Sequence, residues 1–261
     1  MIPSILISTI VGTVVGLKLL ILASRTRHFP ELAIGGALFC YAAIAQTSSF
    51  ATHAVGLEAS HSVRMTLLAL RLAAFYLTMI GLATFTWRVF DASSSIRKTL
   101  TIVLAITAAI TVSASFWAAW NELTYNGGLP LYARLGASPQ YVVVFAWMSI
   151  ESLRYQRLMR KREVLGLADP VVTNRFGIWG LSAAASCVLT FALTIVMIRS
   201  NNMFLGADPV SSAIISATGL VNTLGWWLTF MPPAVYTNWV KARSERSSQN
   251  SSSAAVGTDV G

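Results

Sequence analysis

Three charged side chains lie inside long apolar stretches of this sequence, and these are the residues whose chemistry needs a physical explanation. They are Lys18, Arg71 and Glu151. A charge near the centre of a membrane helix costs about 2.5–3.5 kcal/mol on insertion scales, so such residues usually pair with one another or contact a ligand. Together with the neutral polar residues Gln46 and Asn222, they form our set of candidate ligand or pathway residues.

Lys18 and Glu151 are expected at a similar depth. Lys18 precedes the basic residue Arg25 by seven positions, about 10 Å of helix, and Glu151 lies a similar distance before the basic end of its own stretch. We therefore predict that the two either pair across the first and fifth helices or line one polar cavity. The alternative, which we favour, is that Lys18 extends to the headgroups while Glu151 pairs locally with Arg154 or Tyr155.

Arg71 is expected in the opposite half of the membrane. It follows Arg64 by seven residues, so both fall on one face of the same helix. Such a residue can bind an anionic headgroup or ligand, or pair with Glu122 at the outer end of the next helix. We favour a structural, hydrogen-bonded arginine over a ligand site.

The elements that carry these residues are predicted to be membrane helices. Of the 261 residues, 55% are hydrophobic and only 11% are charged, whereas about a quarter are charged in soluble domains. Seven apolar stretches are each long enough to cross a bilayer, which takes about 20 residues. We predict an all-α bundle of seven transmembrane helices within residues 1–240, with the last helix kinked or broken at Pro232-Pro233. The helices are expected over 3–24, 31–52, 64–90, 99–120, 139–160, 176–198 and 210–240.

The basic residues predict the orientation of this bundle. Most of the 19 Lys and Arg fall in alternate connections, and five of them cluster at the end of the fifth helix. Cytoplasmic connections carry such an excess, so we expect the N-terminus outside and the C-terminus inside, with 241–261 as a disordered cytoplasmic tail. We interpret the basicity as a topology signal of a protein in a lipid bilayer, and nucleic acid is not needed to explain it. The cluster is a candidate surface for a cytoplasmic protein partner. The cluster consists of Arg154, Arg157, Arg160, Lys161 and Arg162.

The sequence holds no recognisable catalytic machinery. The apolar stretches contain no paired carboxylates, no histidine cluster and no nucleophile elbow. Cys40 and Cys187 lie within apolar runs, where cysteine behaves as a small hydrophobic residue. We therefore predict a protein that is not an enzyme, with no cofactor and no metal site.

Two resemblances bear on the fold. The second and sixth helices both carry an Ile-x-Gly motif followed by a cysteine, at Ile34 and Ile178, which is similar to the three-plus-one-plus-three arrangement of PQ-loop sugar transporters. The segment from Ser24 to Gly35, Ser-Arg-Thr-Arg-His-Phe-Pro-Glu-Leu-Ala-Ile-Gly, resembles a group of bacterial seven-helix membrane proteins. That second resemblance implies a seven-helix topology in the bacterial inner (plasma) membrane and supplies no activity.

These observations favour a receptor-like sensor. The expected function is binding of a small or lipidic ligand by the bundle, with the signal passed to a separate partner at the basic cytoplasmic face. The alternative is a small-solute transporter, which predicts pseudo-symmetry between helices one to three and helices five to seven.

Overall fold

The computed structural model describes residues 3–55, 60–91, 93–121, 138–199 and 209–244. In these ranges the chain is helical apart from short connections, which confirms the all-α class. The elements are α1 Pro3–Thr26, α2 Phe29–Phe39, the π-helix η1 Cys40–Gln46, α3 Thr47–Val55, α4 His61–Asp91, α5 Ser95–Trp120, α7 Ser138–Val164, α8 Pro170–Arg199 and α9 Pro209–Phe230. Residues 234–244 are also helical.

Five helical segments within the described ranges are long and apolar enough to cross a membrane. They are Ser4–Thr26, Phe29–Thr52, His61–Phe90, Ser95–Trp120 and Pro170–Ile195. α2, η1 and α3 follow one another without a break and together provide the second of these segments. α7 is 27 residues long, but its second half carries the whole basic cluster. The chain is therefore a multi-pass membrane protein with five candidate spans among its described residues.

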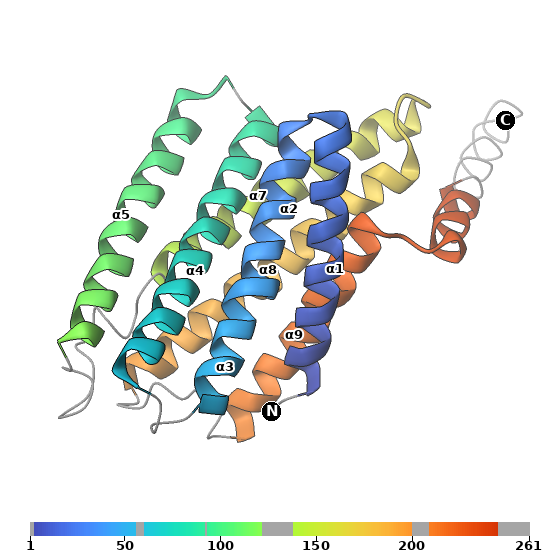
Figure 1. The fold of residues 1–261 in the computed structure, drawn as a ribbon. Coiled ribbons are helices and arrows are strands. Elements are labelled where there is room, and N and C mark those ends of the chain that lie inside the picture. The colour runs from blue at the N-terminus through green and yellow to red at the C-terminus, as the bar shows by residue number, and fades with distance from the viewer. Residues whose placement is uncertain (1–2, 56–59, 92, 122–137, 200–208, 245–261) are drawn as a thin grey trace, which may run out of the picture.

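Six of the long elements form a closed ring, and α5 lies outside it. Around the ring, α1 packs on α2, α2 on α4, α4 on α7, α7 on α8, α8 on α9, and α9 on α1 again. α5 packs against α4 and touches α7 only marginally. Figure 1 shows α5 at the edge of the bundle, separated by α4 from α1 and α2. Any internal site of this fold is therefore surrounded by the six ring elements.

Glycines bring α1 and α2 into close contact. A Cβ atom at Gly16 would lie 2.7 Å from the backbone nitrogen of Phe39, and a Cβ atom at Gly35 would lie 2.8 Å from the Cβ of Leu19. Small residues at such positions let membrane helices approach closely and gain van der Waals contact. The core beside this contact is tightly filled, with Val15 and Ile34 at most 1% exposed.

The connection between α7 and α8 is shorter than predicted. We expected a loop over 161–175, but α7 continues to Val164 and α8 begins at Pro170. Arginine and lysine are good helix formers, so a basic sequence outside the membrane can continue as helix. The Asp169 carboxylate accepts a 2.7 Å hydrogen bond from the Val171 backbone N–H and so caps the start of α8. The remaining turn contains Gly166 in the left-handed region, with φ of 70°.

The last predicted helix, 210–240, is broken at the proline pair where we expected a kink or a break. α9 ends at Phe230, and a separate helix follows Pro232-Pro233, because proline cannot continue the backbone hydrogen bonding of a helix. Residues 241–244, expected in the disordered tail, belong to this second helix, whereas 245–261 lie outside the described residues. The second helix is bonded to the ring through Asn174 and Tyr236, whose side chains are 2.6 Å apart.

Candidate functional site

A cavity of about 270 Å³ lies inside the ring of helices. Its volume is just below the range of about 300–1,000 Å³ that is typical of small-molecule sites. All six ring elements contribute to its wall, whereas no residue of α5 does. The cavity wall therefore joins α1, α2 and α4 to α7, α8 and α9.

The wall of the cavity is mostly apolar and carries uncharged polar groups. Aromatic rings and aliphatic side chains supply most of its surface, and no charged side chain lines it among the described residues. The aromatic residues are Tyr41, Phe75, Tyr141, Phe145, Trp179 and Trp226; the other polar ones are Ser8, Gln46, Thr78, Ser138, Ser182, Ser186, Thr190 and Asn222. This lining suits an amphipathic molecule whose buried part is uncharged.

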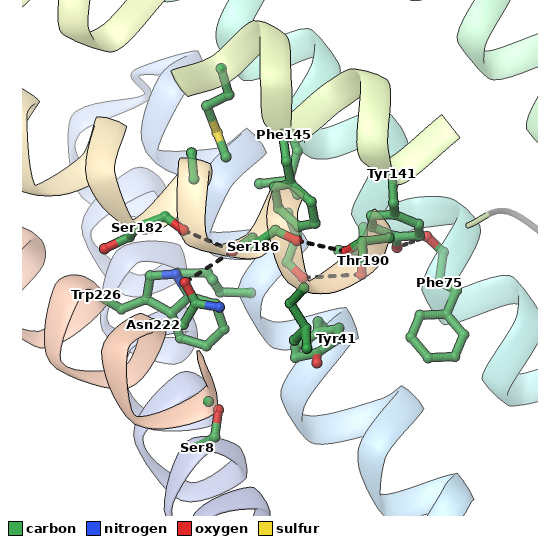
Figure 2. A pocket seen from close by; sticks show the side chains of 18 of the residues that line it. Ser8, Tyr41, Phe75, Tyr141, Phe145, Ser182, Ser186, Thr190, Asn222 and Trp226 are labelled. Atoms are coloured by element: carbon green, nitrogen blue, oxygen red, sulfur yellow. Dashed lines mark hydrogen bonds between the residues drawn. The ribbon is translucent and has the colours of Figure 1, made fainter. Parts of the chain in front are cut away.

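One polar cluster joins α8 to α9 at the cavity wall (Figure 2). The Ser186 hydroxyl lies 2.9 Å from the Asn222 Oδ1 and 2.9 Å from the Ser182 carbonyl oxygen, so it donates to one of these at a time. The Thr190 hydroxyl donates to the Ser186 carbonyl oxygen at 2.8 Å. The structure gives the Asn222 amide nitrogen no partner among the described residues, so this group is available to donate to a bound molecule.

A second group joins α4 to α7 across the cavity. The Tyr141 hydroxyl donates a 2.6 Å hydrogen bond to the Phe75 carbonyl oxygen, and the two rings meet edge to face with centroids 6.3 Å apart. Tyr41 stands between this pair and Trp226, with centroids 6.1 Å from Phe75 and 6.2 Å from Trp226. These contacts hold four aromatic side chains from different elements around one space, as Figure 2 shows.

The π-helix η1 explains how two of the lining residues reach the cavity. Tyr41 and Gln46 are five residues apart, and in an α-helix they would point about 140° away from each other. A π-helix forms its hydrogen bonds over five residues, so residues with this spacing lie nearly in line. The π-helix therefore turns Gln46 toward the cavity beneath Tyr41. Such segments are often found at functional sites.

The cavity occupies one half of the bundle. It extends from Ile5 and Ser138, where α1 and α7 begin, to Met148 and Trp179. Along α7 this is ten residues, or about 15 Å, roughly half of the hydrocarbon thickness of a bilayer. Beyond it, Trp179 packs edge to face against Phe85 and Phe230, with centroids 6.0 and 5.3 Å away. Phe85 and Phe230 each follow the last lining residue of their helix, Leu82 and Trp226, so both rings lie beyond the Trp179 end of the cavity.

The structure separates the five candidate residues. Gln46 and Asn222 line the cavity. Lys18 is exposed on α1, whereas Glu151 forms a 2.7 Å ion pair with Arg97 of α5. Arg97 was not among the partners that we predicted for Glu151, because we had assigned Arg97 to a cytoplasmic connection rather than to a helix.

Arg71 lies beside the cavity rather than in its wall. Its guanidinium carbon is 5.9 Å from the centroid of the Phe75 ring, which does line the cavity. Its Nε is buried and has no hydrogen-bond partner. Glu122, the carboxylate predicted as a partner, lies outside the described residues.

The sequence prediction missed several lining residues, although their spacing held a signal. Ser182, Ser186 and Thr190 are four residues apart, as are Asn222 and Trp226, so each set lies on one helix face. Polar residues repeated at this interval in an apolar helix indicate a face that does not contact lipid. Of these five residues, only Asn222 was among our candidate residues.

The fold and the cavity together define a class: a multi-pass helical membrane protein with an internal, uncharged cavity. Comparison with protein-family models, with curated proteins and with solved structures found no match to this chain. The predicted resemblance to a bacterial seven-helix group therefore receives no support from these comparisons. The functional argument rests on the residues of the chain itself.

Proposed function

We propose that this protein is a receptor-like sensor that binds a small amphipathic molecule in the ring cavity. The observation that carries the proposal is that the cavity occupies one half of the ring and ends on Trp179, with packed aromatic rings beyond it. A ligand that enters at the N-terminal ends of α1 and α7 therefore reaches the middle of the bundle. There it contacts helices that continue to the opposite side of the membrane.

The proposal includes seven spans, with the N-terminus outside and the C-terminus in the cytoplasm of a bacterial cell. α7 and α9 are the additional spans, since both form part of the ring with helices that have the length and composition of spans. The basic cluster supports this orientation, because Arg154, Arg157, Arg160, Lys161 and Arg162 are all exposed in the second half of α7. A reporter fused after residue 244 is expected on the cytoplasmic side.

The same cluster is the proposed output surface. It lies at the end of the ring opposite the cavity mouth, and its charge suits an acidic surface on a separate cytoplasmic protein. Ligand binding at the cavity is expected to change how α7 and α8 pack, and α7 carries the cluster. Cross-linking from a cysteine placed at Arg157, with and without ligand, tests whether a partner is held there.

Binding is tested with 1-decanol as the probe and protein in nanodiscs of a zwitterionic lipid. A ligand that binds only the folded state raises the unfolding temperature as its concentration exceeds the dissociation constant. We expect this rise in the wild type and in Trp227→Phe, because Trp227 is 38% exposed and does not line the cavity. Trp226→Phe and Asn222→Leu are expected to reduce it. An equal rise in all four proteins would show that the alcohol acts through the lipid, which would refute the proposal.

A transporter is the second candidate, and the order of helices around the ring favours it. If α1, α2 and α4 are matched in order with α7, α8 and α9, each contact within the first group has a counterpart in the second. The contact of α4 with α7 then corresponds to the contact of α9 with α1. This is the order expected for two parallel repeats. Substrate-dependent opening of the Trp179 side of the cavity, measured by cysteine accessibility, would favour transport over sensing.

A further inference from the structure

We propose that Arg71 and the ring cavity form one binding site for an amphipathic carboxylate. The carboxylate would bind the Arg71 guanidinium at the mouth, and the apolar chain would extend into the cavity. This inference rests on the proposed function, because it assigns a ligand class to the same cavity.

The spacing along α4 places Arg71 at the cavity mouth. Phe75, Thr78 and Leu82 all line the cavity, and Arg71 precedes them by four, seven and eleven residues on the same helix face. One helical turn is 5.4 Å, so Arg71 lies about one turn nearer the start of α4 than the outermost of these residues. The guanidinium contact with the Phe75 ring agrees with this position.

No residue that the structure describes supplies the acceptor that the partly buried Arg71 guanidinium requires. It offers five N–H donors, yet within the described part of the chain no hydrogen bond and no carboxylate is found for it, and its Nε is fully buried. Arg97, by contrast, has a carboxylate acceptor, because its guanidinium donates a 2.7 Å hydrogen bond to Glu151. A buried charge without a partner is costly. An anionic ligand would remove that cost at Arg71.

The shape of the site selects a carboxylate with an apolar chain. A guanidinium binds a carboxylate with two parallel hydrogen bonds, which fixes the orientation of the bound group. From Arg71 to Leu82 the helix rises by about 16 Å, and the lining over this length is uncharged. The amide of Asn222 and the hydroxyl of Ser186 lie in the wall, where they can bond to a polar atom on the chain.

The test compares decanoate with 1-decanol, which share a chain length and differ in charge. Binding to nanodisc-embedded protein is measured at pH 8 in a zwitterionic lipid, and the ratio of the two dissociation constants is compared between variants. We expect Arg71→Gln to weaken decanoate binding relative to 1-decanol binding by about tenfold or more. The reason is that hydrogen bonds to charged groups are stronger than those between neutral groups. Arg71→Lys keeps the charge without the paired geometry, so it should keep part of the preference.

Arg64→Gln is the matched control, since it removes an arginine from the same face of α4 two turns away. It should leave the ratio unchanged. The inference fails if Arg71→Gln weakens the binding of both probes equally or of neither. It also fails if Arg64→Gln shifts the ratio as much as Arg71→Gln does. In both cases the cavity remains a ligand site. If neither probe binds the wild type, the inference and the proposed function fail together.

Discussion

The ion pair between Arg97 and Glu151 is the contact whose loss should have the largest effect on stability. It joins α5 to α7, and apart from it α5 is held almost entirely by α4. The side chains are 17% and 13% exposed, so both charges are largely removed from solvent. We predict that Arg97→Met and Glu151→Gln each destabilise the protein, because each removes one of the two charges of this ion pair.

The magnitude follows from the geometry. At the observed 2.7 Å, the Coulomb attraction is about 6 kcal/mol for an effective dielectric constant of 20. The cost of desolvating both ions offsets much of this attraction, but the loss of one partner from a buried pair costs about 3–5 kcal/mol. Because both side chains keep some exposure, we expect about 3 kcal/mol for each single variant. The double variant Arg97→Met/Glu151→Gln should cost no more than one of them.

The assay is equilibrium unfolding in mixed micelles with increasing SDS, followed by far-UV circular dichroism. The stability losses expected for the two single variants and the double variant correspond to a coupling energy of about 3 kcal/mol in a double-mutant cycle. Lys18→Met is the control, because Lys18 is exposed on α1 and should change stability by less than about 1 kcal/mol. Single-variant losses below about 1 kcal/mol, or losses that add within about 0.5 kcal/mol, would refute the reasoning.

Two further predictions concern helix packing and the C-terminal helix. Gly35→Ala should destabilise the protein by about 1–3 kcal/mol in the same assay, because the added Cβ would meet α1. Gly36→Ala should be neutral or slightly stabilising, because nothing lies within 4 Å of its added Cβ. Equal effects of the two variants would contradict the packing argument. Asn174→Ala removes the 2.6 Å bond to the Tyr236 hydroxyl and should speed tryptic cleavage within 234–244 several-fold. An unchanged rate, measured in inverted vesicles, would show that other contacts hold this helix.

The sequence was sufficient to predict the helical elements, because apolar length is a strong signal. Each of the seven predicted stretches overlaps a helix, and the break at Pro232-Pro233 follows from the backbone of proline. The ends were less predictable. The extension of α7 through Arg160 to Val164 depends on helix propensity outside the membrane, which the apolar pattern does not report.

The cavity was only partly predictable. Intramembrane charges drew attention to Lys18 and Glu151, yet the structure places neither in the cavity wall, because a charge can also extend to the surface or pair on the outside of a ring. The hydroxyl-bearing residues of the wall gave a weaker signal, since serine and threonine in membrane helices often bond to their own backbone. The π-helix that brings Gln46 to the cavity was not predicted, because our apolar-length criterion does not distinguish it from an α-helix.

The position of α5 has a consequence for chain direction. Because Ile5 of α1 and Ser138 of α7 lie at the same end of the cavity, the two three-helix groups run in the same sense through the bundle. Three antiparallel helices leave the chain on the opposite side from where it started, so one additional crossing is needed before the second group can begin. α5 supplies that crossing while contributing nothing to the cavity wall. Apart from Arg97, which pairs with Glu151, and its packing face on α4, the properties that α5 needs are length and a lipid-compatible surface.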